Sequence, residues 1–339
     1  LELIDSELAV KLEADVDIEA NAVSAGLDWT DLSWPLRDAS PDFVSRSGNL
    51  RIDGSLDQWT TRGQLEIQLG EYPGGRFDLE GGGGRTSARL RVPGGEILGG
   101  NVSGEAAVNW TDGLDWSANI LTRHVDPQPL LPGWPGRLDM ALAIEAASQP
   151  ESYIINLQSL SGGLRGVELN GQGRLVIADS DVSFDQFELH TDEASLWLDG
   201  THVDSDGLSV KFNGDLPSML LQGAGGKLQL EGLYSRYKDQ PVFDIHMEAL
   251  DLSWNGLGIR SLSVNAGGNG RGDPIPPIEL DASGLRWQDQ AIDVLSLSLE
   301  PEGETHRLRA EMAGEKFALE AAMTLAPQDR DELAGSPWS

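Results

Sequence analysis

The chain has 339 residues, among them 41 glycines and no cysteine, and its formal net charge is −31. A hydrophobic content of 39% is enough for a sizeable core, which argues against intrinsic disorder. The strong acidity, without any run of Lys or Arg, excludes a nucleic-acid partner, and the lack of cysteine excludes disulfides, iron-sulfur clusters and thiolate zinc sites.

No stretch of the chain approaches the roughly 18 uninterrupted apolar residues that a membrane-spanning helix needs. The first residue is Leu1 rather than an initiator methionine. We therefore expect residues 1–339 to be a fragment, and either a processed signal peptide or an anchor upstream of Leu1 would explain the missing start.

The dominant pattern along the chain has a period of two residues. Near the start, Leu12, Ala14 and Val16 alternate with Glu13 and Asp15, which is typical of a strand with one dry face and one acidic face. The same alternation recurs at Leu65 to Leu69, Leu138 to Ile144, Leu196 to Leu198, Leu208 to Phe212, Phe243 to Met247, Leu297 to Leu299 and Phe317 to Met323. The pattern predicts an all-β meander.

Short polar or glycine-rich segments separate the predicted strands. Asp112-Gly113, Asp206-Gly207 and Asn255-Gly256 predict turns, and the glycines from Gly81 to Gly84 predict turns or flat strand crossings. Two stretches break the alternation, Pro127 to Leu131 and Pro217 to Leu221, and we expect single helical turns there. Gly267 to Pro277 predicts either a long turn or a weak domain boundary.

The same two stretches reveal an internal repeat with an offset of 90 residues. The offset aligns Pro127 with Pro217, and it keeps strand parity upstream and downstream. It also aligns Leu130 with Leu220, Leu131 with Leu221, Gly133 with Gly223, Arg137 with Lys227 and Met140 with Leu230. We therefore expect residues 101–144 and 191–234 to be degenerate repeats within one continuous structure spanning 1–339.

Catalytic and metal-binding patterns are poor. The five histidines are far apart and never show the spacing of paired metal ligands. Asp204-Ser-Asp206-Gly207 lacks the further oxygen ligands of a calcium loop, and we interpret it as an acidic turn. The tripeptide Arg271-Gly-Asp273 is too short to carry a function. We expect no enzyme activity, no catalytic residue, no metal and no cofactor.

The chain resembles the TamB family at several successive places. The resemblance is carried by Trp110-Thr-Asp-Gly-Leu-Asp-Trp116, Asp126-Pro127, Leu131-Pro-Gly-Trp-Pro-Gly-Arg-Leu138, Gly171-Gln-Gly-Arg-Leu175, Leu196-Trp-Leu-Asp-Gly200, Gly226-Lys-Leu-Gln-Leu230 and Gly303-Glu-Thr-His-Arg-Leu308. Related AsmA-like proteins share such glycine-punctuated strands.

The resemblance implies a protein of the Gram-negative envelope, anchored in the inner membrane and reaching across the periplasm. It also implies an elongated, curved, mostly antiparallel sheet that forms an open apolar groove, with few short helical turns. The implied partners are phospholipid and an outer-membrane TamA-like barrel protein. The family's membrane-contacting ends are not recognisable in this chain.

The alternation by itself leaves two interpretations of the apolar face. It covers either a filled sandwich, solenoid or barrel core, or an open trough that takes acyl chains. The resemblance favours the trough. Its predicted lipid-contacting residues are Leu196, Leu198, Leu228, Leu230, Phe243, Ile245, Met247, Leu297 and Leu299. Tryptophans in or beside the strands, such as Trp29, Trp254 and Trp287, are expected to pack in the core or along the rim.

These observations predict a non-enzymatic periplasmic β-groove that holds phospholipid acyl chains and conducts them toward the outer membrane. The alternative is a scaffold or chaperone for outer-membrane or autotransporter proteins, whose open strand edges pair with client strands. A secreted lectin or polysaccharide lyase would need a clustered carboxylate or basic site, which the sequence lacks.

Overall fold

The structure is a computed structural model that describes residues 2–5, 10–17, 21–34, 43–55, 57–69, 73–148, 151–178, 181–201, 207–215, 223–237, 240–267, 276–288, 290–303, 305–315 and 317–325. Every regular element in these residues is a β-strand. The predicted all-β class is therefore confirmed. The chain divides into two compact units, Leu1–Val182 and Ser183–Ser339, here called unit 1 and unit 2.

Unit 1 contains the first strands of the chain. They are β1 (Glu2–Asp5), β2 (Val10–Asp17), β3 (Ala22–Trp34), β4 (Phe43–Gly54), β5 (Trp59–Leu69), β6 (Gly75–Gly83), β7 (Ser87–Ile97), β8 (Gly100–Asn109), β9 (Asp115–Val125), β10 (Gly136–Ser148), β11 (Glu151–Leu164) and β12 (Val167–Ala178).

Unit 2 contains most of β13 (Asp181–Thr191) and the strands that follow it. They are β14 (Ala194–Thr201), β15 (Leu208–Asp215), β16 (Gly225–Tyr237), β17 (Gln240–Trp254), β18 (Leu257–Gly267), β19 (Ile278–Trp287), β20 (Gln290–Glu302), β21 (Thr305–Gly314) and β22 (Phe317–Leu325).

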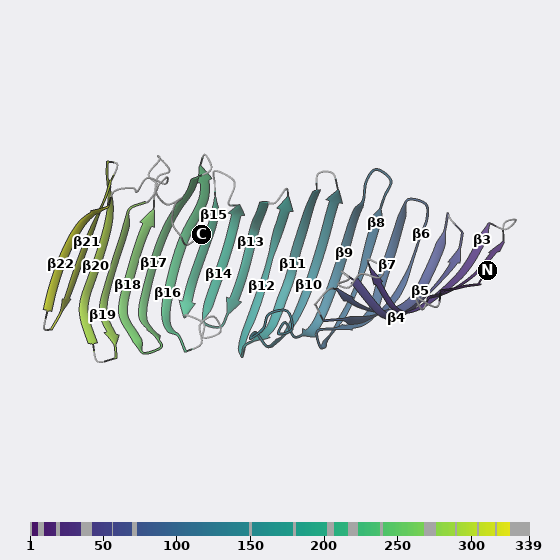
Figure 1. Cartoon of the computed structure of the whole chain (residues 1–339), viewed down its shortest axis with the longest axis horizontal. Coiled ribbons are helices and arrows are strands. Elements are labelled where there is room, and N and C mark those ends of the chain that lie inside the picture. The colour runs from purple at the N-terminus through teal and green to yellow at the C-terminus, as the bar shows by residue number, and fades with distance from the viewer. Residues whose placement is uncertain are drawn as a thin grey trace, which may run out of the picture. The chain divides into compact units, whose positions relative to one another are not determined.

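Within each unit, consecutive strands pair antiparallel with each other, as in β8–β9, β9–β10 and β16–β17. Figure 1 shows the strands of each unit side by side in chain order. No pairing in the described residues joins β1 to β12 or β13 to β22, so each unit is an open meander. The predicted open antiparallel sheet is thus confirmed for each unit.

Side-chain alternation gives each sheet an apolar face and a polar face. Residues directly opposite each other on paired strands point to the same side, so the register groups them into rows across the sheet. One apolar row of unit 1 is Leu90, Ala106, Ala118, Ile144, Ile155 and Leu175. The neighbouring row on the polar face is Arg91, Glu105, Asn119, Ala143, Asn156 and Arg174.

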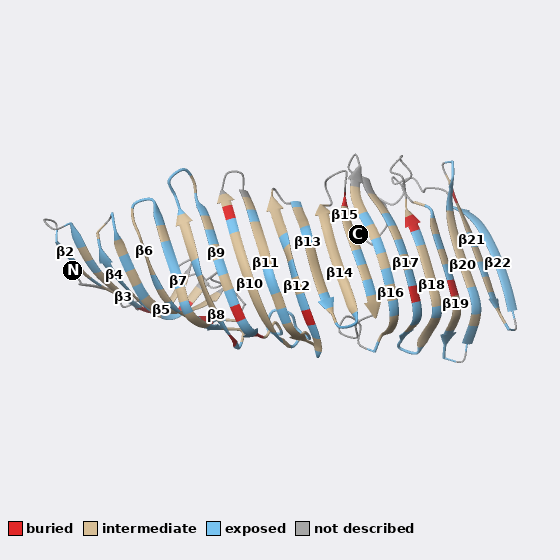
Figure 2. Cartoon of the chain, turned by 180° about the vertical axis from the view of Figure 1, so that it is seen from behind, coloured by how far each residue is buried: buried red, intermediate tan, exposed pale blue. Residues whose placement is uncertain are grey.

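Few side chains in the described residues are fully buried, as the scarcity of red in Figure 2 shows. The buried apolar ones are Trp29, Val125, Ala146, Leu169, Ala249, Ala266 and Ala282, and the buried polar ones are Ser45, Thr122 and His306. All of them occupy rows of the apolar face. Most of the buried apolar residues are alanines, whereas larger aliphatic side chains on this face are only half-buried.

Bulges interrupt several strands, and acidic side chains satisfy the backbone at two of them. His124 has a φ of 58° and Gln186 a φ of 48°, which is unusual for residues other than glycine. The amide of His124 donates to Oδ1 of Asp139 at 2.6 Å, and the amide of Gln186 donates to Oδ1 of Asp199 at 3.1 Å. Because a bulge bends its strand and increases the twist, these carboxylates help to fix the curvature of the sheets.

The predicted turns are reproduced where the structure describes them. Asp112-Gly113 lies between β8 and β9, and Asn255-Gly256 between β17 and β18. The amides of Leu130 and Leu131 both donate to the carbonyl of Pro127, at 2.9 and 2.8 Å, which makes the single helical turn that we predicted.

The glycines from Gly81 predict either turns or flat strand crossings. The structure shows the second, because Gly81 to Gly83 belong to strand β6. A Cβ on Gly83 would lie 2.5 Å from the carbonyl oxygen of Ser87 and 2.7 Å from the Trp59 ring, so neighbouring strands approach too closely for a larger residue.

Several predicted features lie outside the described residues: the turn at Pro217 to Leu221, the acidic turn at 204–206, the tripeptide at 271–273 and most of 267–277. The repeat remains a prediction. Residues 101–144 contain strands from β8, β9 and β10. Residues 191–234 contain strands from β14, β15 and β16 in the same order.

Candidate functional site

The nine predicted lipid-contacting residues all lie in unit 2 and all occupy one face of its sheet. The register puts Leu196, Leu230, Met247 and Leu297 in a single row. The complete row reads Leu196, Phe212, Leu230, Met247, Val264, Leu280, Leu297, Ala310 and Ala321. It crosses β14 to β22 without a polar residue.

A second apolar row lies beside the first. It reads Leu198, Val210, Gly232, Ile245, Ala266, Ile278, Leu299, Leu308 and Met323. Leu228 belongs to a third row, opposite Ala249, and Phe243 to a fourth, opposite Tyr234. The structure therefore brings all nine predicted residues onto one continuous apolar surface, which we call the inner face of unit 2.

The residues between them point the other way and are polar. Asp244 and His246 flank Ile245 and are both exposed. His246 lies opposite Glu231 and Asn265, and its Nδ1 is 2.6 Å from Oδ1 of Asn265. Because neighbours along a strand point to opposite sides, the inner face is apolar while the outer face is hydrophilic.

The inner face is open rather than filled. Ile245, Met247, Leu230 and Leu297 are all half-buried. The described residues of unit 2 contain no helix, and its strands pack against their neighbours in the sheet. A filled sandwich core would bury these large side chains almost completely, because protein interiors are close-packed. Their partial burial is the geometry of a surface that can take an apolar ligand.

Unit 1 carries a matching apolar surface, whose residues are not among the predicted lipid contacts. Its members include Leu142, Ile144, Ile155, Leu157 and Leu175, which are half-buried. The alternation in β10 was visible in the sequence. In β11, however, a register shift between Leu157 and Leu160 breaks the period, and the adjacent Ile154 and Ile155 point to opposite faces. The run therefore lacked the regular signature of a strand with one dry face.

One place on the inner face of unit 1 is closed by protein. Trp29 is 7% exposed and lies opposite Gly48, where a Cβ would be only 2.0 Å from the indole atom Cζ2. The indole Nε1 donates to Oγ of Ser45 at 2.8 Å, and Ser45 Oγ donates in turn to the carbonyl of Glu66 at 2.8 Å. Trp29 thus packs over β4, and the Ser45 hydroxyl connects its indole to β5 by two hydrogen bonds.

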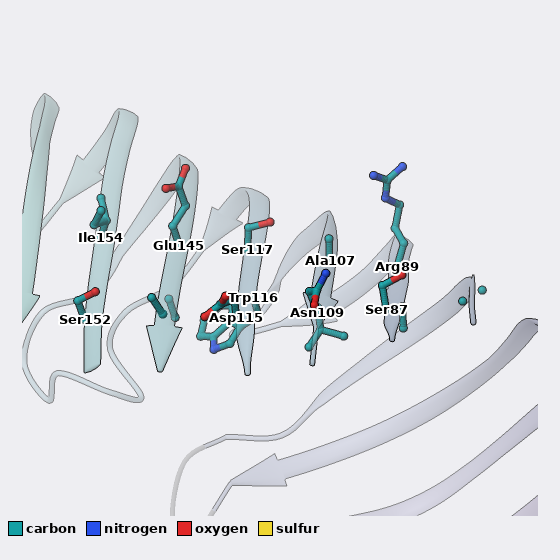
Figure 3. A pocket seen from close by; sticks show the side chains of 16 residues that line it. Ser87, Arg89, Ala107, Asn109, Asp115, Trp116, Ser117, Glu145, Ser152 and Ile154 are labelled. Carbon is teal, nitrogen blue, oxygen red and sulfur yellow. The ribbon is translucent and has the colours of Figure 1, made fainter. Parts of the chain in front are cut away.

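A hollow of about 770 Å³ in unit 1 combines polar and small side chains from β6 to β11. Figure 3 shows Arg89, Ala107, Ser117 and Glu145 on four successive strands, β7 to β10, where the register gives them one outer row. Arg89 and Glu145 are separated by two strands, a span of about 14 Å at the usual strand spacing. This is too far for them to act on one small group as an acid–base pair.

The histidines that the structure describes do not form a cluster. His124 is exposed at a bulge and His246 is exposed on an outer row, while His306 is 6% exposed on the inner face. Across the residues placed by the structure, no three His, Asp or Glu side chains are arranged to hold a metal ion. Nor does that part of the chain contain a helix with the length and hydrophobicity needed to cross a bilayer.

Comparison with known proteins agrees with the resemblance noted in the sequence. The family profile described as "TamB, N-terminal domain" matches residues 4–332, which is nearly the whole chain. No solved structure matches the chain. The chain therefore belongs to the TamB family, whose members are associated with the cell envelope and linked to the transport of lipid or protein there.

Proposed function

We propose that the inner face binds the acyl chains of phospholipids and lets them move along the sheet, in the periplasm and without any chemical step. The observation that carries the proposal is the open, uninterrupted apolar surface of unit 2, where large aliphatic side chains are only half-buried. Each methylene that such a surface removes from water contributes about 0.8 kcal/mol. Covering the surface with acyl chains is therefore strongly favourable.

The geometry suits sliding rather than tight binding. The apolar rows run across β14 to β22, which at about 4.8 Å per strand gives a path on the order of 40 Å within unit 2. Apolar contacts are non-directional, so a tail meets similar neighbours at each step along the row. The headgroup stays in water at the open side, and the acidic outer rows keep the protein hydrated.

Membership of the TamB family supports the rest of the proposal. We propose attachment to the inner membrane through a segment outside this sequence, and cooperation with a TamA-like protein of the outer membrane. In this arrangement the chain carries phospholipid toward the outer membrane.

A pair of matched crosslinking positions tests lipid contact. A photo-crosslinking amino acid at Ile245 is expected to capture phospholipid in cells, whereas the same group at Asp244 or His246 is not, because these neighbours point outward. The adducts are identified by mass spectrometry of the purified protein. Equal capture at inner and outer positions would refute the assignment of the inner face to lipid.

The edge strand β22 favours the second candidate function, a scaffold for outer-membrane proteins. All of its residues are exposed, and Phe317, Leu319 and Met323 are 41%, 55% and 53% exposed. In the described residues β22 pairs only with β21, and it carries no proline or bulge that would discourage a further strand. Such an edge suits pairing with an extended client segment.

A crosslinker at Leu319 tests this second candidate against the first. The scaffold function predicts an adduct with a tagged, unfolded autotransporter β-domain at Leu319 and none at Leu230, which lies within the sheet on β16. Lipid adducts at both positions, without the client protein, would reject the scaffold.

A further inference from the structure

Most of the tryptophans and tyrosines on the inner faces of the two units lie at strand ends, with Trp29 and Tyr234 as exceptions. Trp59 begins β5, Trp116 is the second residue of β9, Tyr153 the third of β11, and Trp254 and Trp287 end β17 and β19. All of them lie on apolar rows. The middle of the same face is occupied mainly by Leu, Ile, Val and Ala, so Trp and Tyr mark its margins.

The clearest such margin is in unit 2, at the ends of β17 and β19. Trp254 lies opposite Leu257, and Leu257 lies opposite Trp287, so the three side chains form one short row. Trp254 is 46% exposed and Trp287 60% exposed. The two indoles stand two strands apart, about 10 Å at the usual spacing. We call these three residues the aromatic rim.

The rim continues the apolar surface rather than standing apart from it. Leu252 and Ile259 form the next row inward, and Ala249 and Leu262 the row beyond that. A ligand whose tails cover these inner rows would bring its polar end toward the strand ends, where Trp254 and Trp287 lie.

Trp29 shows what a structural tryptophan of this protein looks like. Its indole lies in the middle of a strand, is 7% exposed, and donates its N–H to Ser45. The rim indoles are instead largely open to solvent, so packing within the protein does not explain their size or position. Because the two indoles and Leu257 form one contiguous exposed apolar row, they have the character of a contact surface.

An indole suits a boundary between hydrocarbon and water. Its ring is apolar while its N–H donates a hydrogen bond, and tryptophan is therefore enriched at the interfacial layer of membranes. A phospholipid has the same boundary at its glycerol and ester groups, whose oxygens accept hydrogen bonds.

We propose that the aromatic rim binds the glycerol–headgroup region of a phospholipid whose tails lie on the inner rows of unit 2. The inference rests on the proposed lipid-binding function and extends it, since it assigns the polar end of the ligand to a defined place. The rim holds the lipid in one orientation, with tails toward Leu262 and Ala249 and the headgroup beyond Trp254 and Trp287.

Fluorine NMR of the fluorotryptophan-labelled chain tests the orientation. The signals of Trp254 and Trp287 are assigned with Trp254→Phe and Trp287→Phe, which are mild changes at exposed sites. The labelled protein is then loaded with phosphatidylcholine carrying a nitroxide either on the headgroup or at the tail end. We expect the headgroup nitroxide to remove most of the intensity of both rim signals, and the tail-end nitroxide to remove much less.

Another tryptophan of unit 2 serves as an internal control. Trp197 lies on an outer row opposite Lys211, so neither nitroxide should broaden its signal. Rim signals that behave like Trp197, or that respond more to the tail-end label, would overturn the proposal. Failure of lipid capture at Ile245 would instead overturn the proposed function itself, so the two results are distinguishable.

Discussion

The region around Trp29 and the region around Ile245 arise from the same sequence pattern but differ in how they are covered. Each residue lies on the inner face of its own unit, in the middle of a long strand. Trp29 is 7% exposed and its indole is hydrogen-bonded to Ser45, whereas Ile245 is half-buried among other aliphatic side chains. One region is sealed by the protein, and the other is open.

This difference shows what the alternation of apolar and polar residues can predict. It predicts which side chains share one face of the sheet, but it does not predict whether other parts of the protein cover that face. Near Trp29, the backbone of Asp31 has a φ of 53° and the β4 register shifts between Val44 and Ser47. These irregularities bring Ser45 under the indole. In unit 2 the strands around Ile245 pair regularly, so no side chain folds over the face. A stability measurement should therefore separate the two regions.

Trp29→Ala is expected to have the largest effect on stability. Removing a buried indole leaves a cavity over Gly48 and should cost about 3–5 kcal/mol. Hydrogen exchange of the amides of β3 to β5 should accelerate accordingly, while the amides of unit 2 serve as the control. Unchanged protection in β3 to β5 would mean that the indole is not a structural element.

Ser45→Ala should have the next largest effect on stability. The substitution removes the partner of Trp29 Nε1 and of the Glu66 carbonyl, and leaving buried polar groups unsatisfied costs about 1–3 kcal/mol. Urea denaturation followed through fluorescence measures the loss. Ser47→Ala is a suitable control because Ser47 is exposed on the same strand, and equal effects of the two variants would contradict the role of the Ser45 hydroxyl.

Ile245→Asp should barely change stability, by about 1 kcal/mol or less, since the side chain is half-buried on an open face. It should nevertheless greatly reduce the phospholipid that copurifies with the chain, because a carboxylate would interrupt the apolar row. Native mass spectrometry measures the bound lipid. Leu250→Asp, on an outer row of the same strand, should leave lipid binding intact.

A severe loss of folding in Ile245→Asp would point to a packed core instead. An unpaired buried carboxylate costs several kcal/mol, so melting or precipitation of this variant would contradict the open face.

The smallest effect on stability is expected from an exposed ion pair of unit 1. The Arg85 guanidinium pairs with the Asp57 carboxylate and lowers the pKa of Asp57, while the same pairing raises the pKa of Arg85. Since the folded-state pKa of Asp57 lies below its unfolded value, the pair stabilises the fold at neutral pH. The contribution is lost as the pH falls through the folded-state pKa.

Asp57→Asn should therefore lower the urea midpoint slightly at neutral pH and not at all in acid. Both side chains are largely exposed, so the difference is small and should shrink at high salt. A difference between the two proteins that persists in acid would mean that the carboxylate charge is not its cause.

The sequence alone was enough to predict the strands and the apolar residues that share the inner face of unit 2. From Phe243 to Met247 the alternation is regular, and β17 keeps that regularity against both neighbours over these residues. The alternating pattern could not distinguish Trp29 from Trp254, because their difference depends on a bulge that moves Ser45 and on the distance of each indole from a strand end. The apolar rows of unit 1 were missed in β11, because its register shift hides the period.

The strictly sequential pairing of the strands has a consequence for how the chain folds. Because each strand of a unit pairs only with its neighbours in the sequence, every contact in the sheet closes a short loop, and low contact order favours rapid folding. Each new hairpin can add to a finished edge without rearranging the strands already in place. Such a sheet can assemble progressively as the polypeptide emerges from a translocation pore, and it can lengthen in evolution by duplicating hairpins in pairs, which preserves both strand direction and the side on which the apolar residues fall.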